Sequence, residues 1–501
     1  MRRRSLPILS FVLVLLTSSS TFAQQSGSTT RITVNPAERF QFIEGFGVNV
    51  VGPWFRDDQK ATFDKLIDDL GASMFRVGAY IVHENWEEVN MHDPSKIDVE
   101  GNRDQELAVQ GVSANWEYWE NRYSSPLFEA SWAEMRYLNS RGIRPLVALY
   151  GSIPDWMTDD TVGPLDKAVS LDELYRNRKN HLSPKMYDAF AEEVVSMLAY
   201  ARSNAHVEFS GFSPFNETTC NPTEGPGISS GEAPAVLDAV AKELNKEGLP
   251  DVKLVVADQC SAADDFFGPI LSDARLMKQV GALDLHNYGD NEHVALNAGR
   301  IQKSKFPQTP LWLTEYGELN DLDRTAENDW HDFSLAVGRR GLSALNQGAT
   351  VLMYWDAFDD YEDCVQRICY YGLFRSAGRV YQAKKRYFAL KQLYHFVPPG
   401  SQRIAATTSA TGLTVSAFRN AEANSIVLVG VKEGGPGHIR VTLPKQGPAP
   451  AAWELYETTR LVNCAKVDSV SVRDGDAEID LPDQAVFTLV GTLPKPEKAL
   501  P

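Results

Sequence analysis

The stretch FSGFSPFNE, Phe209–Glu217, is a run of small and apolar residues that stops at an Asn-Glu pair. A loop containing Thr, Asn, Pro and Gly follows. This pattern is typical of a buried strand that ends at the glutamate. A second stretch, TPLWLTEYG from Thr309 to Gly317, repeats the arrangement with a short apolar run that ends on Glu315. The two stretches predict two strands, each holding a glutamate at its end.

The same alternation of short apolar runs with amphipathic segments extends through most of the chain. Eight runs are predicted to be strands: Ile43–Val50, Ser73–Val77, Arg144–Leu149, Phe209–Phe215, Lys253–Ala257, Ala282–Leu285, Pro310–Thr314 and Thr350–Tyr354. The predicted helices between them include Asp57–Leu70, Lys185–Ser203, Glu232–Glu247 and Asp329–Gln347. This order predicts an α/β fold, a (β/α)8 TIM barrel over residues 41–393, with its active site at the carboxyl ends of the strands.

Beyond the barrel, residues 394–501 have a different pattern of short alternating runs separated by Gly, Asn and Pro. Four of these runs are predicted to be strands: Leu413–Phe418, Ser425–Val431, His438–Leu443 and Ala485–Leu489. The pattern predicts a C-terminal antiparallel β-sandwich as a side domain.

Residues 1–23 begin with three arginines, continue through an apolar segment and end in Thr21-Phe22-Ala23. This is typical of a secretory signal peptide, with a retained membrane anchor as the alternative, so we expect a secreted or periplasmic protein. The formal net charge of −17 argues against nucleic acid or an anionic membrane as partner, because phosphates would repel the surface. A neutral oligosaccharide or polysaccharide fits this charge best.

The five cysteines are too few for a disulfide scaffold and lack the spacing of a metal finger. Cys220 with Cys260 and Cys364 with Cys369 are two pairings that stay open. An acidic cluster follows the eighth run and is interpreted as a solvated loop, since it lacks the spacing of a calcium loop; it comprises Asp356, Asp359, Asp360, Glu362 and Asp363. We expect neither a metal nor a cofactor.

Glu217 and Glu315 are the candidate catalytic residues, because glycoside hydrolysis needs one carboxylic acid to protonate the departing oxygen and a second carboxylate to attack the sugar or activate water. Other polar and aromatic residues at predicted strand ends are candidates for substrate binding, since aromatic rings stack on the C–H faces of sugars. They are Arg76, Asn216, His286, Tyr288, Trp54, Trp156 and Trp355. A tryptophan-rich insertion with Trp86, Trp116 and Trp119 follows the second strand.

Several motifs together resemble glycoside hydrolase family 30, within clan A of the retaining glycoside hydrolases. They are the opening Gln41-Phe-Ile-Glu-Gly-Phe-Gly47, the third-strand set Ser152, Pro154, Trp156 and Met157, the segment Ser213–Glu217, and the barrel exit Tyr387–Ile404. The resemblance covers nearly all of the chain after residue 23. It departs from the family at Thr218, where family members usually carry proline. The resemblance also suggests that residues 24–40, with a strand at Arg31–Val34, join the side domain.

The resemblance implies retaining hydrolysis of a β-linked glycan, with Glu217 as acid/base and Glu315 as nucleophile. It implies that Asn216 binds the sugar 2-hydroxyl, that Arg76 and Tyr288 keep Glu315 ionised, and that Trp355 forms the floor of the sugar site. The candidate substrates include β-1,6-galactan, β-glucan, xylan and small β-glycosides. A cellulase-like family 5 relative and a non-catalytic glycan-binding barrel remain alternatives.

Overall fold

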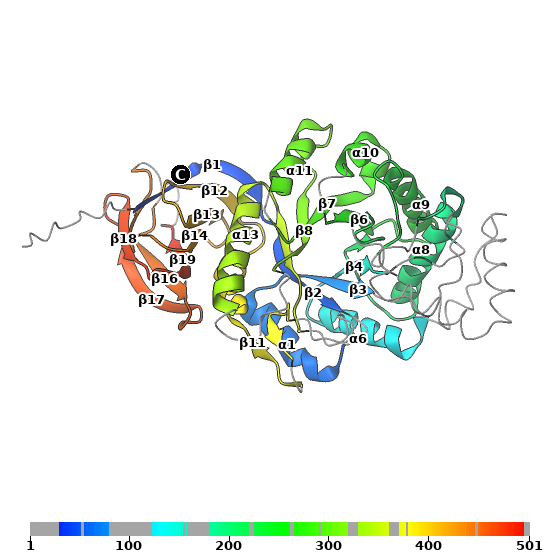
Figure 1. Cartoon of the computed structure of the whole chain (residues 1–501), viewed down its shortest axis with the longest axis horizontal. Helices are drawn as coiled ribbons and strands as arrows, with labels where there is room; N and C mark the ends of the chain where they lie inside the picture. Colours follow the sequence, from blue (N-terminus) through cyan, green and yellow to red (C-terminus); the bar gives the residue numbers. More distant parts are fainter. Residues whose placement is uncertain are drawn as a thin grey trace, which may run out of the picture.

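The computed structural model describes residues 30–51, 55–79, 123–151, 153, 157, 181–219, 225–260, 265–289, 292–318, 329–359, 370–376, 379–435, 437–445 and 449–494. Figure 1 shows a barrel surrounded by helices and, at the other end of the molecule, a β-rich body. Several features of the sequence analysis lie outside the described residues: the leader 1–23, Trp54, Trp86, Trp116, Trp119, Trp156, Cys220, Cys364, Cys369, Asp360, Glu362 and Asp363.

Eight strands close into a barrel in which every neighbouring pair is parallel. They are β2 (Gly45–Val51), β3 (Met74–Ala79), β4 (Leu146–Leu149), β5 (Gly211–Ser213), β6 (Lys253–Gln259), β7 (Val280–Asn287), β8 (Leu311–Tyr316) and β9 (Val351–Tyr354). Each predicted run overlaps one of these strands, so the predicted TIM barrel is confirmed. The strands are buried almost throughout, because side chains fill the barrel and helices cover its outside.

Strands β7 and β8 extend further than predicted. His286 pairs with Glu315 and Asn287 with Tyr316, so the ladder continues beyond the predicted ends of both apolar runs. The side chains of His286 and Glu315 are therefore carried by strand backbone rather than by a loop.

The helical layer consists of short turns and longer helices with apolar inner faces. They are η2 (Asp57–Gln59), α1 (Lys60–Asp64), η3 (Lys65–Leu70), α6 (Pro126–Ser140), η6 (Pro184–Met186), α8 (Tyr187–Ser203), α9 (Ala233–Lys246), α10 (Phe267–Ser272), η7 (Leu276–Lys278), α11 (Glu292–Lys303), η8 (Asp329–Ser334), α13 (Leu335–Asn346) and α14 (Lys385–Tyr394). In α9, Pro234 lies in the first turn, and Val236, Val240 and Leu244 recur at helical spacing on the buried face.

The side domain is a nine-stranded sheet that is mostly antiparallel. Its strands are β1 (Thr30–Phe42), β12 (Gln402–Thr408), β13 (Leu413–Asn420), β14 (Ser425–Lys432), β15 (His438–Thr442), β16 (Ala452–Thr458), β17 (Ala465–Ser471), β18 (Asp476–Asp480) and β19 (Ala485–Thr492). The predicted β-sandwich side domain is confirmed. The sequence pattern did not predict β12, β16, β17 or β18. A separate pair, β10 (Phe374–Arg375) and β11 (Gln382–Ala383), lies beyond the barrel.

Strand β1 comes from the N-terminal part of the chain yet lies inside the side domain. It pairs antiparallel with β12 and parallel with β15, and in Figure 1 it runs from the β-rich body to the barrel. Both ends of the described chain therefore build the side domain, which is the arrangement that the family 30 resemblance implies.

Strand β14 is buried on both faces because it belongs to two cores. Ile426 and Leu428 point into the interior of the side domain. Val427, Val429 and Val431 belong to the core of the barrel, where α13 and α14 cover them. Successive side chains of a strand point to opposite faces, so one face of β14 packs into the side domain and the other against the barrel. This shared packing joins the two domains.

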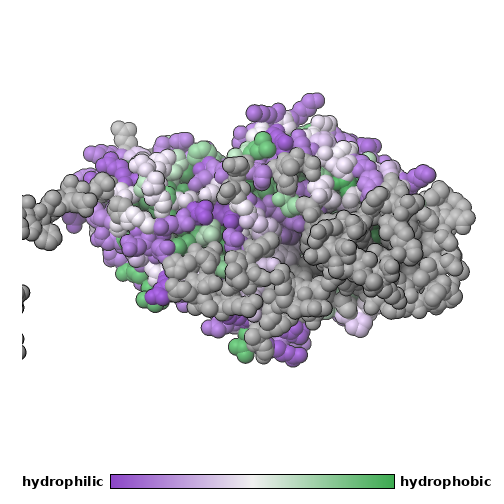
Figure 2. All heavy atoms as spheres, viewed as in Figure 1, coloured by the Kyte–Doolittle hydropathy of each residue, from purple (hydrophilic) through white to green (hydrophobic). Residues whose placement is uncertain are grey.

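The described surface is mostly polar. Figure 2 shows hydrophilic residues over most of the described part of this face, with small separate apolar patches. Among the described residues, no helix is both long and apolar enough to cross a bilayer. Cys464 carries a free thiol, whereas Cys260 is disulfide-bonded.

The interpretation of the acidic cluster as solvated is wrong for its described members. Asp356 and Asp359 are 3% and 5% exposed. Asp359 accepts hydrogen bonds from the Lys384 ammonium at 2.5 Å and from the Gly372 amide at 3.1 Å. A buried carboxylate needs such partners, so this segment is tied to the start of α14 instead of being solvated.

Candidate active site

Glu217 lies four residues beyond the end of β5 and has a left-handed backbone, with φ of 45°. Its amide donates to the carbonyl of Asp258 at 2.9 Å, and Asp258 itself has φ of 47°. This conformation is disfavoured for residues with a Cβ, so tertiary contacts must hold it. One such contact is the close approach of the backbone at Gly225 to Asn216. A Cβ at Gly225 would lie 1.8 Å from the carbonyl oxygen of Asn216, so only glycine fits there.

Glu315 lies near the end of β8, and both of its carboxylate oxygens accept hydrogen bonds. Oε1 accepts from Nη1 of Arg76 at 2.6 Å and from the hydroxyl of Tyr150 at 2.7 Å. Oε2 accepts from the hydroxyl of Tyr288 at 2.5 Å. Three donors aimed at one buried carboxyl group favour its ionised form.

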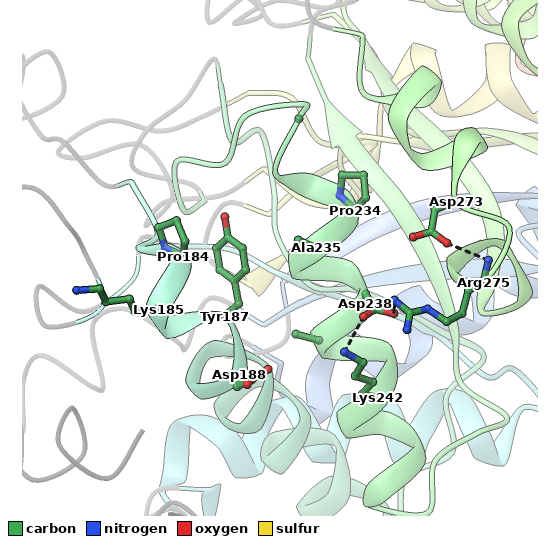
Figure 3. Close-up of a pocket in the computed structure, with 12 residues that line it drawn as sticks. Pro184, Lys185, Tyr187, Asp188, Pro234, Ala235, Asp238, Lys242, Asp273 and Arg275 are labelled. Carbon is green, nitrogen blue, oxygen red and sulfur yellow. Dashed lines mark hydrogen bonds and ion pairs between the residues drawn. The ribbon is translucent and has the colours of Figure 1, made fainter. Parts of the chain in front are cut away.

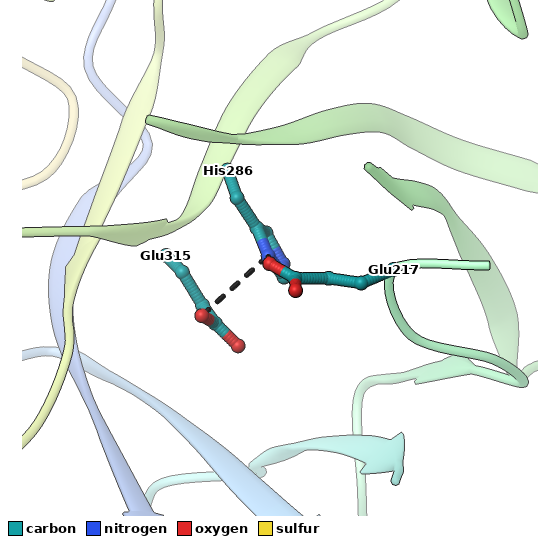
Figure 4. A group of neighbouring side chains, drawn as sticks. All are labelled: Glu217, His286 and Glu315. Atoms are coloured by element: carbon teal, nitrogen blue, oxygen red, sulfur yellow. Dashed lines mark hydrogen bonds and ion pairs between the residues drawn. The ribbon is translucent and has the colours of Figure 1, made fainter. Parts of the chain in front are cut away.

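His286 lies between the two glutamates and contacts both, as Figure 4 shows. Its Nδ1 is 2.7 Å from Oε1 of Glu217 and 3.5 Å from Oε2 of Glu315, and its Nε2 is 3.2 Å from Oδ1 of Asp258. Burial opposes a charged imidazole, but the charge of Glu315 and the bonds to Asp258 and Glu217 raise the pKa of His286 well above its usual value. Because both ring nitrogens face carboxylate oxygens, the site favours the imidazolium form of His286.

The two candidate catalytic carboxylates are close together. One oxygen of Glu217, one oxygen of Glu315 and one nitrogen of His286 all lie within 4.8 Å of one another. A sugar bound over this group would have a carboxyl group within reach on each side of its anomeric carbon.

Arg76 is the central cation beneath these groups and is fully buried. Its Nη1 also donates to Oδ1 of Asn49 at 3.0 Å, and its Nη2 donates to Oδ1 of Asn216 and to Oδ2 of Asp258, both at 2.9 Å. Burial opposes the charge, but Asp258 and Glu315 raise the pKa of Arg76 above its usual value. The guanidinium thereby links strand ends on opposite sides of the barrel.

The pKa of Glu315 differs from the expectation that Arg76 and Tyr288 keep this carboxyl group ionised. His286, Arg76 and the Tyr288 hydroxyl favour its charged form, as the resemblance implies for Arg76 and Tyr288. Burial acts against them, with a smaller contribution from the charge of Glu217, and the net effect raises the pKa of Glu315 above its usual value. The carboxylate is thus more basic than an exposed glutamate.

Trp355 lies beside the same residues, directly after β9, and is 7% exposed. Its ring centroid is 5.9 Å from that of Tyr150, and Tyr288 and Tyr371 pack against this pair. The structure therefore brings together Arg76, Asn216, Glu217, His286, Tyr288, Glu315 and Trp355 from the predicted set. Trp54 and Trp156 lie outside the described residues.

Comparison with known proteins agrees with this architecture. No protein-family model matches the chain. Solved structures that resemble it include a glycoside hydrolase family 30 subfamily 8 xylanase from Clostridium acetobutylicum, with 18% identity, a TM-score of 0.66 and coverage of 92% of this chain and 99% of that one. An endo-β1,6-glucanase has 17% identity, a TM-score of 0.59 and coverage of 92% and 94%. A family 39 enzyme from Xanthomonas axonopodis pv. citri has 14% identity, a TM-score of 0.56 and coverage of 94% and 99%.

The resemblance to family 30 is confirmed at the level of the fold.

Some residues of the site were not predicted to be functional. Tyr150 follows β4 directly, so the strand-end reasoning that selected Tyr288 would have selected it too. Asn49, Asp284 and Thr314 lie inside strands, where the pattern shows only an isolated polar residue in an apolar run.

Two sets of side chains have the composition of a cation site, each with ligand atoms within 4.8 Å of one another: Glu217, His286 and Glu315, and Asp258, Asp284 and His286. In both sets the side chains already hydrogen-bond to each other or to neighbouring protein groups. Arg76 and His286 supply positive charge at the same place.

Two cavities elsewhere differ from this site in their chemistry. One of about 480 Å³ lies between η6, α8 and α9 in the outer helical layer; there Lys242 and Arg275 both pair with Asp238 (Figure 3). Another of about 640 Å³ is lined by residues at the amino-terminal ends of β2, β8 and β9, including Glu44 and Thr350. The paired glutamates lie at the opposite, carboxyl ends of the strands, where TIM barrels carry their active sites.

Proposed function

We propose that this chain is a secreted, retaining β-glycoside hydrolase that acts on a neutral β-linked glycan by double displacement. The observation that carries the proposal is the pair Glu217 and Glu315, whose nearest carboxylate oxygens lie within 4.8 Å at the carboxyl ends of a TIM barrel. Retaining enzymes hold their carboxyl groups about 5 to 5.5 Å apart, whereas inverting enzymes need about 6.5 to 9.5 Å to admit a water molecule. The separation supports retention.

The contacts divide the two roles between the glutamates. Glu315, held by Arg76, Tyr150 and Tyr288, attacks the anomeric carbon, because these donors fix its oxygens and favour the charged form. Glu217 protonates the departing oxygen in the first step and activates water in the second.

Asn216 and Trp355 bind the sugar in this proposal. Asn216 carries its side chain beside Glu217 and binds the sugar 2-hydroxyl, and Trp355 offers a ring for the sugar to stack on. His286 orients the Glu217 carboxyl group between the two steps.

The leader of residues 1–23 directs the protein out of the cytoplasm.

The class of substrate is supported by charge and by the related folds. A formal net charge of −17 disfavours an acidic polymer. Proteins of similar fold are named as xylanases and as an endo-β1,6-glucanase. Xylan and β-1,6-glucan are therefore the first substrates to test, followed by β-1,6-galactan and small β-glycosides.

The test is turnover of these polysaccharides and of a panel of aryl β-glycosides, with the Glu315→Gln variant as the matched control. We expect sugar release by the native chain and none by the variant, which keeps the shape of the side chain but loses the nucleophile. Equal release by both proteins, or no release from any β-glycoside, would refute the proposal. Binding on a glycan array without turnover would then favour a non-catalytic glycan-binding barrel.

A further inference from the structure

Two carboxyl groups lie beneath the paired glutamates on neighbouring strands. Asp258 is near the end of β6 and Asp284 is in the middle of β7, and both are fully buried. The hydroxyl of Thr314, from β8, lies between them, 2.6 Å from Oδ1 of Asp258 and 2.5 Å from Oδ2 of Asp284. The hydroxyl therefore bridges two acids that come from different strands.

Proton counting at this bridge requires one of the acids to be neutral. A contact between two oxygens at such a distance needs a proton between them. The threonine hydroxyl has only one proton, so it donates to one carboxyl group and must accept from the other. One of the two aspartates consequently carries a proton.

The surrounding charges assign that proton to Asp284. Asp258 accepts from Nη2 of Arg76 at 2.9 Å and faces Nε2 of His286 at 3.2 Å, so two cations hold it ionised. Asp284 also accepts from the backbone amide of Asp258 at 3.2 Å, and among the described residues no cation is hydrogen-bonded to it. Burial and the charge of Asp258 raise the pKa of Asp284 well above its usual value. Burial also opposes the charge of Asp258, but Arg76 together with the bonds to Asp284 and His286 lowers the pKa of Asp258 well below its usual value.

The charged groups that act on Asp284 are Asp258 on the neighbouring strand β6, His286 on β7 itself and, through space, Arg76 on β3. The neighbouring strand β8 carries Glu315 next to the bridging Thr314. The two cations Arg76 and His286 already face the two carboxylates Asp258 and Glu315. An ionised Asp284 would add an unbalanced negative charge to a buried site.

We propose that Asp284 is a neutral carboxylic acid that positions the catalytic site through a relay of hydrogen bonds. It donates to Thr314, Thr314 donates to Asp258, and the Asp258 carboxylate then anchors Arg76 and His286, which hold the two glutamates. Asp284 is a positioning residue, and its role in catalysis rests on the proposed function. Its protonation state does not, because that follows from the Thr314 contacts and from the charges around the two aspartates.

Infrared difference spectroscopy tests the protonation without any substrate. The native protein, held at a pH where ordinary aspartates are ionised, should show the carbonyl band of a protonated carboxyl group, with a shift in deuterated water. The band should disappear in Asp284→Asn and remain in Glu217→Gln, which separates it from any proton on Glu217. A spectrum that Asp284→Asn leaves unchanged would overturn the proposal.

The pH profile of hydrolysis tests the relay. Asparagine donates and accepts like a neutral carboxylic acid, so Asp284→Asn should keep the acid limb of kcat/KM in place. Asp284→Val and Thr314→Val interrupt the relay and weaken the hold of Asp258 on Arg76 and His286. Those two cations lower the pKa of Glu315, so the acid limb should move upward by about one pH unit. Thr314→Ser should restore the native profile.

A shift in Asp284→Asn equal to that in Asp284→Val would show that the native group is charged and would overturn the proposal. If the valine variants fail to fold, Asp284→Asn and Thr314→Ser decide through the same two measurements. Failure of the proposed function would appear as absence of hydrolysis in the native protein, and it would leave the infrared result intact.

Discussion

Glu217 and Glu315 have different surroundings, and that difference separates their roles. Glu315 accepts from a guanidinium and two phenols. Glu217 accepts from the His286 imidazolium, at the end of a strand with a left-handed backbone. Unequal partners of this kind are expected where an acid and a nucleophile share one site, as we propose for these two glutamates.

Removal of each carboxyl group in turn should produce opposite products. In Glu217→Ala, azide should attack the glycosyl-enzyme formed on Glu315 and give a β-glycosyl azide from an activated aryl β-glycoside. In Glu315→Ala, azide should enter the vacated space and give the α-anomer. Mass spectrometry and NMR of the products check this, and the same anomer from both variants would contradict the assigned roles.

The hydroxyl of Tyr288 should set the acid limb of activity. Its bond to Oε2 lowers the pKa of Glu315, so Tyr288→Phe should raise that pKa and move the acid limb of kcat/KM to higher pH. Tyr316→Phe is the control, because the Tyr316 hydroxyl contacts that of Tyr394. An acid limb that moves downward or stays in place in Tyr288→Phe would be inconsistent with this account.

Much of the site could be predicted because its polar residues follow or end apolar runs. Glu217 and Glu315 occupy such positions, and Arg76 lies near the end of its predicted run. Asp284 and Thr314 could not be predicted, because a single polar residue inside a buried run has many causes. Their meaning depends on β6, β7 and β8 lying side by side, which the pairing of strands decides.

At the scale of elements, the segment after β5 decides where Glu217 points. Gly225 brings the chain back against the backbone of Asn216. Gly225→Ala should therefore displace Glu217 and lower kcat more than it raises KM. Gly231→Ala is the matched control, since an added Cβ there meets nothing within 4 Å. Steady-state kinetics of both variants decide, and native kcat in Gly225→Ala would exclude a role for this contact.

Burial explains part of the strand prediction in the side domain. Strands β13, β14 and β19 carry continuous or alternating apolar residues and were predicted. Strand β17 was not, because it is exposed along nearly its whole length and alternates little. Its position is set by pairing with β16, and β16 in turn pairs with β19.

At the scale of the whole molecule, β14 makes the barrel and the side domain one packed unit. Leu428→Ala, in the core of the side domain, should reduce stability by about 2 to 5 kcal/mol. Thermal unfolding followed by circular dichroism and by loss of activity should shift together, because the other face of β14 lies in the barrel core. Val467→Ala, at a position 46% exposed, is the control. An unchanged midpoint for loss of activity would show that the two bodies unfold independently.

The most direct test of the central claim is the anomeric configuration of the first product. Proton NMR should follow hydrolysis of a β-linked substrate from the first minutes, before mutarotation mixes the anomers. The proximity of Glu217 and Glu315 predicts that the β-anomer appears first and the α-anomer only later. Initial appearance of the α-anomer would mean inversion and would contradict the double displacement proposed for these two glutamates.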